Sequence, residues 1–129
     1  MTYLLDTHVL LWLLSDATRV PDRIRDRLAD PANGLLVSAA SGLEIATKVR
    51  IGKLDAPDLP TTLAGRVERI GARLLPISLE HALVAGSMPW PHRDPFDRLL
   101  VAQAMIENAT LVTVDAAVSG LYSPAILTW

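Results

Sequence analysis

Short apolar runs alternate with longer amphipathic segments along the whole of this 129-residue chain. The clearest runs, at 3–5, 35–37 and 110–114, are too short for helices and are mostly apolar at successive positions. That pattern is typical of strands buried on both faces, which occur in parallel sheets covered by helices. The sequence therefore predicts an α/β fold with a short central parallel sheet of about four to five strands and helices on both faces.

Proline, glycine and capping residues mark where the predicted helices begin and end. Ser41 is followed three residues later by Glu44, the spacing of a capping box, so a helix over 41–51 is expected to start there. No repeat or linker divides the predicted elements, and the sequence therefore predicts one domain over 1–129. The other expected helices are 9–14, 21–29, 61–71, 79–85 and 95–108, and weaker strands are expected at 74–77 and 125–128.

Composition removes several classes of protein. The chain has no cysteine, which excludes disulfides, zinc–thiolate sites, iron–sulfur clusters and cysteine nucleophiles. Half of the residues are hydrophobic, so the chain is not intrinsically disordered. No segment approaches the roughly 20 apolar residues that a membrane span needs, and no signal peptide is recognisable. We therefore expect a cytoplasmic protein without a membrane anchor.

The charge balance limits how this chain could bind nucleic acid. It has 12 basic and 14 acidic side chains, a formal net charge of −2. A protein that holds nucleic acid by its overall positive field is strongly basic. Any nucleic-acid role must therefore come from a local arrangement of residues.

Two carboxylates directly follow predicted strands. Asp6 comes after the run 3–5, and Asp115 comes after the run 110–114. In open parallel sheets, ligands bind beyond the carboxyl ends of the strands. Both side chains are therefore expected in the same crevice.

Three more acidic residues stand near predicted helix starts. Glu44 is expected in the first turn of the helix after the run 35–37, and Asp94 and Asp97 in the first turn of the long helix over 95–108. Carboxylates that converge without basic partners repel one another unless a hard divalent cation joins them. The set therefore indicates Mg²⁺ or Mn²⁺, whereas the lack of Cys and of an HExxH pair argues against catalytic zinc.

Each acid also has a purely structural explanation, as a helix cap, a partner of the helix dipole or a member of an ion pair. Four independent caps at one edge of the sheet are less expected than one shared site. The structural alternatives are a cap for Asp6, Asp94 and Asp115, a dipole position for Asp97, and a capping box or a pair with Lys48 for Glu44.

Several segments together carry a family resemblance. In order and spacing, over essentially the whole chain, they resemble PIN-domain ribonucleases, and most closely the toxins of bacterial VapBC toxin–antitoxin pairs. One departure is Gly42-Leu43, where relatives often carry a bulky aromatic residue. The segments are Leu-Leu-Asp-Thr-His at 4–8, the helix start at 38–48, His-Arg-Asp-Pro-Phe-Asp-Arg-Leu-Leu-Val-Ala-Gln-Ala at 92–104, and Thr113-Val114-Asp115.

The resemblance implies a PIN-like three-layer sandwich and assigns roles by position. Asp6, Glu44, Asp97 and Asp115 match the four acids that in this family bind Mg²⁺ or Mn²⁺ and cleave RNA. The implied reaction is hydrolysis of an RNA phosphodiester bond by a water that the metal activates. Asp6 and Asp97 are expected as direct metal ligands. Glu44 and Asp115 are expected to orient the water or to complete a second metal position, and the number of metals stays open.

The same resemblance ranks the remaining polar residues. Asp97 rather than Asp94 takes the ligand position, because the run Leu-Leu-Val-Ala-Gln-Ala that follows fixes the register, and Asp94 is expected as a cap. Thr113 matches a position where the family often has a hydroxyl that supports the acids. His8 and His92 could contact the substrate, but structural roles are favoured, because neither has the spacing of a metal ligand.

Three basic residues are candidates for contact with the RNA backbone. Lys48 lies one turn beyond Glu44, where an ion pair on the helix surface is the alternative. Arg93 and Arg98 flank the acids of the long helix, where they could contact phosphates or only screen the acids. Trp90 lies between two prolines and is expected to be exposed. It could stack on a base or receive an antitoxin side chain, and packing within its own loop is the alternative.

The resemblance also implies partners. It implies an RNA substrate, a cognate antitoxin that inserts into the acidic groove, and a homodimer formed by the early helices. The alternative is a non-catalytic PIN-like module that binds RNA or protein, which would be expected to have lost one or more of the acids. Setting the four acids aside leaves 10 of the 14 acidic residues against 12 basic ones, so the metal-loaded protein would be mildly basic.

Overall fold

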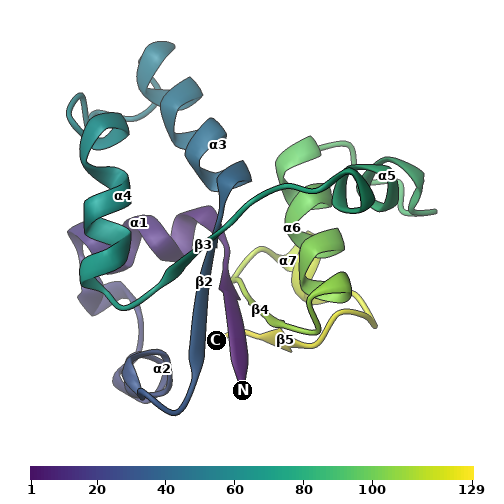
Figure 1. Cartoon of the computed structure of the whole chain (residues 1–129), viewed down its shortest axis with the longest axis horizontal. Coiled ribbons are helices and arrows are strands. Elements are labelled where there is room, and N and C mark those ends of the chain that lie inside the picture. The colour runs from purple at the N-terminus through teal and green to yellow at the C-terminus, as the bar shows by residue number, and fades with distance from the viewer.

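The computed structural model describes the whole chain, residues 1–129, and its centre is a sheet of five parallel strands. The strand order is β3-β2-β1-β4-β5, and all four pairings are parallel (Figure 1). This confirms the predicted α/β class and the central parallel sheet. The strands are β1 (Thr2–Leu5), β2 (Gly34–Ser38), β3 (Arg73–Leu75), β4 (Thr110–Val112) and β5 (Ile126–Leu127).

Helices cover both faces of the sheet and complete three layers. Helices α1, α2 and α4 lie on one side of the strands in Figure 1, and α5, α6 and α7 lie on the other, with α3 rising beyond the carboxyl ends of the strands. A short 3₁₀ turn, Ala17–Arg19, joins α1 to α2. The helices are α1 (Thr7–Ser15), α2 (Asp22–Ala29), α3 (Ala39–Arg50), α4 (Leu59–Arg69), α5 (Leu79–Ser87), α6 (Pro95–Ile106) and α7 (Ala116–Ser119).

The central strands are apolar at successive positions because each of their faces packs into a separate core. In β1, Tyr3 and Leu5 pack with residues of α1, α2 and α4, whereas Leu4 packs with residues of α6. Neighbouring β2 alternates in the same way, with Leu35 and Val37 on the first face. Because such a strand is buried on both faces, its sequence is a continuous apolar run.

Three element ends differ from the sequence expectation. Strand β4 ends at Val112, so two residues separate it from Asp115, although the Thr113 N–H still donates to Leu127 O at 3.1 Å. Strand β3 ends at Leu75 because Pro76, which has no N–H, follows it. Helix α6 ends at Ile106, and Asn108 two residues later takes a left-handed φ of 51°.

The predicted capping box at Ser41 is wrong. Ser38, the last residue of β2, caps α3 instead, and its side chain accepts a hydrogen bond from the Ala40 N–H. The chain therefore enters α3 straight from the strand, and Glu44 falls in the second turn rather than the first. Ser41 is buried, and its hydroxyl hydrogen-bonds that of Thr7 at 2.9 Å, which ties α3 to the start of α1.

None of the helices combines the length and the apolar character that a membrane crossing requires.

Replacing Leu5 by Ala is expected to destabilise the protein by about 2–5 kcal/mol, because this fully buried side chain fills the core on one face of the central strand. Leu83 on α5 is 59% exposed, and the same change there is expected to cost less than about 0.5 kcal/mol. Urea unfolding of both variants measures the difference. Equal stabilities would contradict the position assigned to β1.

Candidate active site

The acidic residues gather where the chain changes direction within the sheet. From β1 the chain passes to β2 and β3 on one side, and it returns to β4 and β5 on the other side. Such a switch point opens a crevice at the carboxyl ends of the two strands, and ligands bind there in parallel sheets. Asp6 directly follows β1, and its N–H donates to Val112 O on β4 at 2.9 Å.

Asp6 is buried and held by two hydrogen bonds. Its Oδ1 accepts from the His8 N–H at 3.0 Å, which caps α1, and its Oδ2 accepts from the Thr113 hydroxyl at 2.7 Å. The capping alternative for Asp6 therefore holds, but it uses one lone pair of one oxygen only. Each oxygen retains a lone pair that can bind a cation.

Thr113 connects two of the predicted acids. Its hydroxyl is fully buried, donates to Asp6 Oδ2 and accepts from the Asp115 N–H at 3.1 Å. Asp115 is exposed, and its Oδ1 accepts from the Ala117 N–H at 2.9 Å as the cap of α7. One hydroxyl thus orients the buried acid and the backbone of the exposed one.

Asp97, in the first turn of α6, is the acid whose pKa is clearly shifted. Burial raises the pKa of Asp97 from 3.8 to about 6, although a hydrogen bond with His92 acts in the opposite direction. The negative charges of Asp94, Asp6 and Asp115 raise this pKa further. The structure therefore brings Asp97 into the same field as the acids at the ends of β1 and β4.

Asp94 is the cap that the sequence suggested. Its Oδ1 accepts from the N–H groups of Phe96 at 2.9 Å and Asp97 at 3.3 Å. Because one oxygen of Asp94 is already committed to the helix start, its contribution to the site is mainly its charge.

Glu44 stands apart from this group. It is 8% exposed on α3, and its Oε2 lies 3.0 Å from Lys48 Nζ, which is the ion pair that the structural alternative expected. The charges that raise the pKa of Asp97 come from other acids. The bond between Ser41 and Thr7 nevertheless brings the helix of Glu44 beside the start of α1, next to Asp6.

The acids do not form a ready-made metal cage. No three His, Asp or Glu side chains lie close enough together to hold a metal ion. Mg²⁺ usually keeps several waters and binds through one or two carboxylates, so a complete protein cage is not required for it. Asp6 is buried beside this crevice, and Asp97 is half-buried at the start of α6.

Arg98 serves the loop 88–94 between α5 and α6, and not an open surface. Its Nε donates to Ala85 O at 2.7 Å, and its Nη2 donates to Met88 O at 2.8 Å. Its Nη1 donates to Trp90 O at 2.6 Å and His92 O at 2.9 Å. The guanidinium is thus occupied by four backbone carbonyls, which does not support a phosphate contact from Arg98.

Trp90 and His92 pack against each other within the loop 88–94. Trp90 is half-buried against the second core, so the prediction that it is exposed is wrong. Its ring stacks on that of His92, with centroids 4.6 Å apart and planes at 21°. His92 Nε2 lies 2.7 Å from Asp97 Oδ2, a contact that sequence reasoning missed although both residues belong to the segment 92–104.

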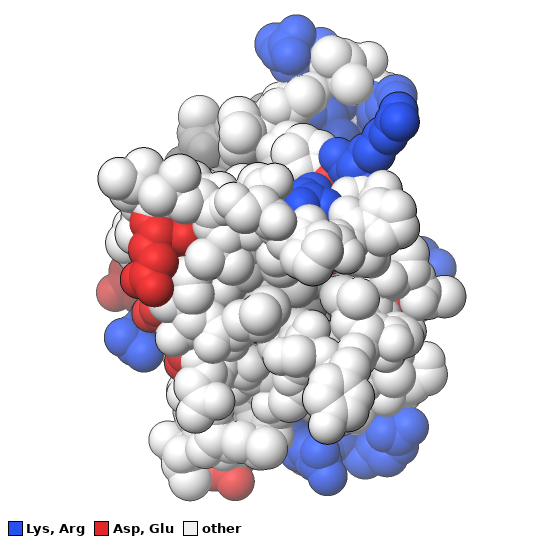
Figure 2. Space-filling view, turned by 90° about the vertical axis from the view of Figure 1, so that its right-hand side faces the viewer, with Lys and Arg blue, Asp and Glu red and all other residues white.

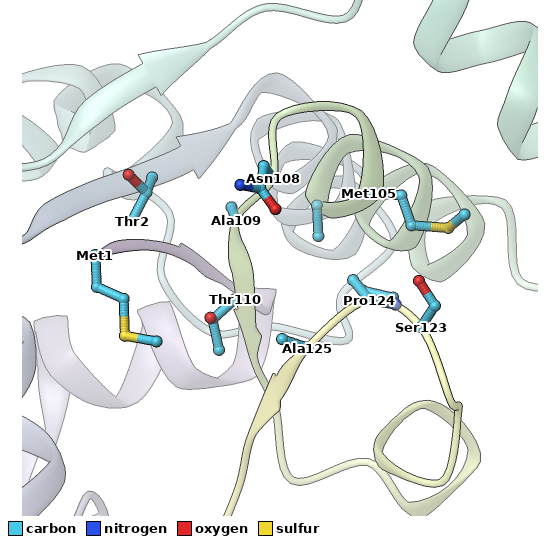
Figure 3. Close-up of a pocket in the computed structure, with 10 residues that line it drawn as sticks. Met1, Thr2, Met105, Asn108, Ala109, Thr110, Ser123, Pro124 and Ala125 are labelled. Carbon is cyan, nitrogen blue, oxygen red and sulfur yellow. The ribbon is translucent and has the colours of Figure 1, made fainter.

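A pocket without acids lies at the opposite end of the strands. It has a volume of about 460 Å³ and lies at the amino ends of β1 and β4, beside Thr2 and Thr110 (Figure 3). No Asp, Glu, Lys, Arg or His side chain lines it. This pocket therefore lacks the groups that acid–base or metal chemistry needs, whereas the carboxyl ends of the same strands have them.

Charged side chains are unevenly spread over the surface. Figure 2 shows a largely uncharged face, with Lys and Arg side chains at its upper and lower ends and Asp and Glu side chains at one side. This face carries no continuous basic surface, as the net charge of −2 suggests. Arg93 is exposed beside the acids of α6 and remains a candidate for phosphate contact.

Asp97→Asn is expected to stabilise the metal-free protein at neutral pH. Because the folded pKa of about 6 lies above the ordinary 3.8, the folded state binds this proton more tightly than the unfolded chain does. The wild type therefore loses stability as pH rises from about 4 to about 6, and the variant avoids that loss.

Urea unfolding in EDTA between about pH 4 and about pH 8 measures this effect. The free energy of unfolding of the Asn variant should exceed that of the wild type by an amount that grows up to about pH 6 to 7 and then stays constant. Asp26→Asn on the exposed face of α2 is the control, for which no such trend is expected. A difference between wild type and Asp97→Asn that does not change with pH would contradict the raised pKa of Asp97.

Comparisons with known proteins agree with this architecture. The family model described as "PIN domain" matches residues 3–122. A search among curated proteins gave no match. Three solved structures cover 100% of this chain. A chain of VapBC2 from Rickettsia felis bound to a fragment of promoter DNA matches with a TM-score of 0.74, 20% identity and 99% of that chain covered.

The other two solved structures match this chain over a similar length. DNA-bound VapBC from Salmonella typhimurium gives a TM-score of 0.74 and 16% identity, with 98% of that chain covered. VapBC-1 from nontypeable Haemophilus influenzae gives a TM-score of 0.70 and 20% identity, again with 98% of that chain covered. At these identities the likeness shows the fold alone. The family model, in contrast, spans nearly the whole sequence, and the chain therefore belongs to the PIN domain family.

Proposed function

We propose that this protein is the toxin of a VapBC-type toxin–antitoxin pair and acts as a Mg²⁺- or Mn²⁺-dependent endoribonuclease. The observation that carries this proposal is the shared electrostatic field of Asp6, Asp97 and Asp115 at the switch point of the sheet. Membership of a nuclease family and the likeness to VapBC structures support it.

The donor set suits a hard divalent ion. Asp6 and Asp97 offer only carboxylate oxygens, and Asp97 Oδ1 makes no hydrogen bond in the structure. Burial raises the pKa of Asp97 most, and the negative charges of Asp94, Asp6 and Asp115 raise it further. A bound cation would offset the cost of keeping Asp97 ionised in these surroundings. We therefore assign Asp6 and Asp97 as the residues that hold the ion.

The chain's own residues then prepare phosphodiester hydrolysis. When bound, the ion would activate the attacking water and offset negative charge on the phosphate. Thr113 fixes the carboxylate of Asp6, and His92 fixes that of Asp97. Glu44, on α3, and Asp115, after β4, would orient the water or contribute to a second ion position. Lys48, which neutralises Glu44, would stand at the rim where a phosphate enters.

We further propose an antitoxin partner and a homodimer, acting in the cytoplasm on RNA, with residues 1–129 forming one PIN domain. Chains in VapBC structures share this fold, which supports a protein partner. The field of clustered carboxylates would attract a basic antitoxin side chain as it attracts a metal ion. The antitoxin would then inhibit by occupying the metal position.

Asp6→Asn is expected to reduce Mg²⁺-dependent RNA cleavage by more than about 100-fold, since residues that merely orient metal ligands already cost about 10- to 100-fold. The fold should persist, because Asn keeps the shape of the side chain and an oxygen for the His8 N–H. Cleavage of total RNA with Mg²⁺, and again with EDTA, measures the activity.

Asp58→Asn is the matched control, because Asp58 is exposed and its side chain makes no capping bond. This variant should cleave like the wild type. Full activity of Asp6→Asn would overturn the site assignment. RNA binding without any EDTA-sensitive cleavage by the wild type would favour the non-catalytic PIN-like module instead.

Expression of this chain alone is expected to arrest bacterial growth, and co-expression of the product of the neighbouring open reading frame should relieve the arrest. The inactive Asp6→Asn variant should be harmless in both settings. Growth curves and co-purification of the two chains measure these effects. Arrest that persists in the presence of the neighbouring product would contradict the antitoxin assignment.

A further inference from the structure

The side chain of Arg98 reaches back from α6 to the loop 88–94 and the end of α5. Three nitrogens of its guanidinium donate four hydrogen bonds, of 2.6 to 2.9 Å, to backbone carbonyls. Only the planar fork of Arg presents donors in several fixed directions at once, whereas a Lys ammonium is a single point of charge. The loop is therefore closed by one side chain that Lys cannot replace.

The loop that Arg98 holds carries two stacked rings. Trp90 stands between Pro89 and Pro91, and its ring stacks on that of His92 at 4.6 Å. The Arg98 guanidinium carbon lies 6.0 Å from the centre of the Trp90 ring. Arg98 thus contacts the backbone of His92 directly and supports its ring through Trp90.

His92 in turn fixes one oxygen of Asp97. His92 Nε2 lies 2.7 Å from Asp97 Oδ2, and because an ionised carboxylate can only accept, the imidazole donates. This bond fixes the rotation of the carboxylate and leaves Oδ1 without a partner. Carboxylates that bind metals are commonly oriented by such hydrogen bonds, and losing them weakens the metal site.

We propose that Arg98 is a positioning residue of the active site, which holds the loop 88–94 so that His92 orients the carboxylate of Asp97 toward the metal ion. Arg98 acts through His92 and does not touch the RNA. This inference rests on the proposed function, because it names how that site is kept in shape.

Arg98→Lys tests the proposal, since it keeps the positive charge but loses the fork. We expect the affinity of the metal-free protein for Mn²⁺ to fall by about 10- to 100-fold, and kcat for RNA cleavage to fall with it. The KM for RNA and its dependence on salt should stay unchanged. A raised KM with unchanged Mn²⁺ affinity would instead make Arg98 a phosphate contact and overturn the proposal.

A double-mutant cycle separates positioning from general stability. If Arg98 acts through His92, Arg98→Lys should have little further effect on Mn²⁺ affinity once His92 has been changed to Ala. Full additivity of the two substitutions would overturn the proposal. Arg23→Lys is the control, because Arg23 is exposed on α2, outside the loop and the acids, and this change should leave Mn²⁺ affinity unchanged.

Nuclear magnetic resonance of the wild type keeps the proposal testable if Arg98→Lys fails to fold. We expect the Nε–H of Arg98 and the Nε2–H of His92 to be protected from exchange with water in the metal-free protein. Adding RNA should leave the Arg98 signal in place. Fast exchange of both protons, or a shift of the Arg98 signal with RNA, would overturn the proposal. Absence of RNA cleavage by the wild type would count against the proposed function alone, because exchange and Mn²⁺ affinity do not depend on it.

Discussion

The cost of ionising Asp97, a half-buried carboxylate with other acids around it, is the constraint on which the rest of the site depends. Burial and neighbouring acids raise the pKa of Asp97 to about 6, so the site is costly to keep fully ionised without a cation. The chain orients Asp6 with a neutral hydroxyl and a backbone N–H, and only Glu44 has a Lys partner. The negative field is therefore preserved at the point where a divalent ion would bind.

Helix α6 organises the surroundings of this field. It presents Asp97 in its first turn, holds the loop 88–94 through Arg98, and contacts the ends of β2 and β3 through Gln103. The fully buried Gln103 accepts from the Ser38 hydroxyl, which caps α3, and donates to Pro76 O at 3.2 Å. One helix thus fixes the proposed metal ligand Asp97, the loop beside it and the start of the helix that carries Glu44.

Local patterns were enough to predict the fold class and the places of Asp6, Asp94 and Asp97, but not the helical turn of Glu44 or the end of the strand before Asp115. Strands β1, β2 and β4 are buried on both faces, so their residues are apolar at successive positions and the strands can be recognised in the sequence. Asp6 follows its strand directly, as expected. The cap of α3 was not predictable, because Ser38 and Ser41 are both good caps and only the length of β2 decides between them. The roles of Arg98 and Trp90 depend on how α5 and α6 pack, which no local pattern records.

Calorimetric titration of the metal-free protein with Mn²⁺, in buffers of different ionisation enthalpy, tests the central claim most directly. At about pH 6, about half of the Asp97 carboxylates carry a proton, so binding should release a corresponding fraction of a proton. At about pH 8 the affinity should be higher and proton release should vanish. No binding, or binding that neither releases protons nor changes with pH, would contradict the account.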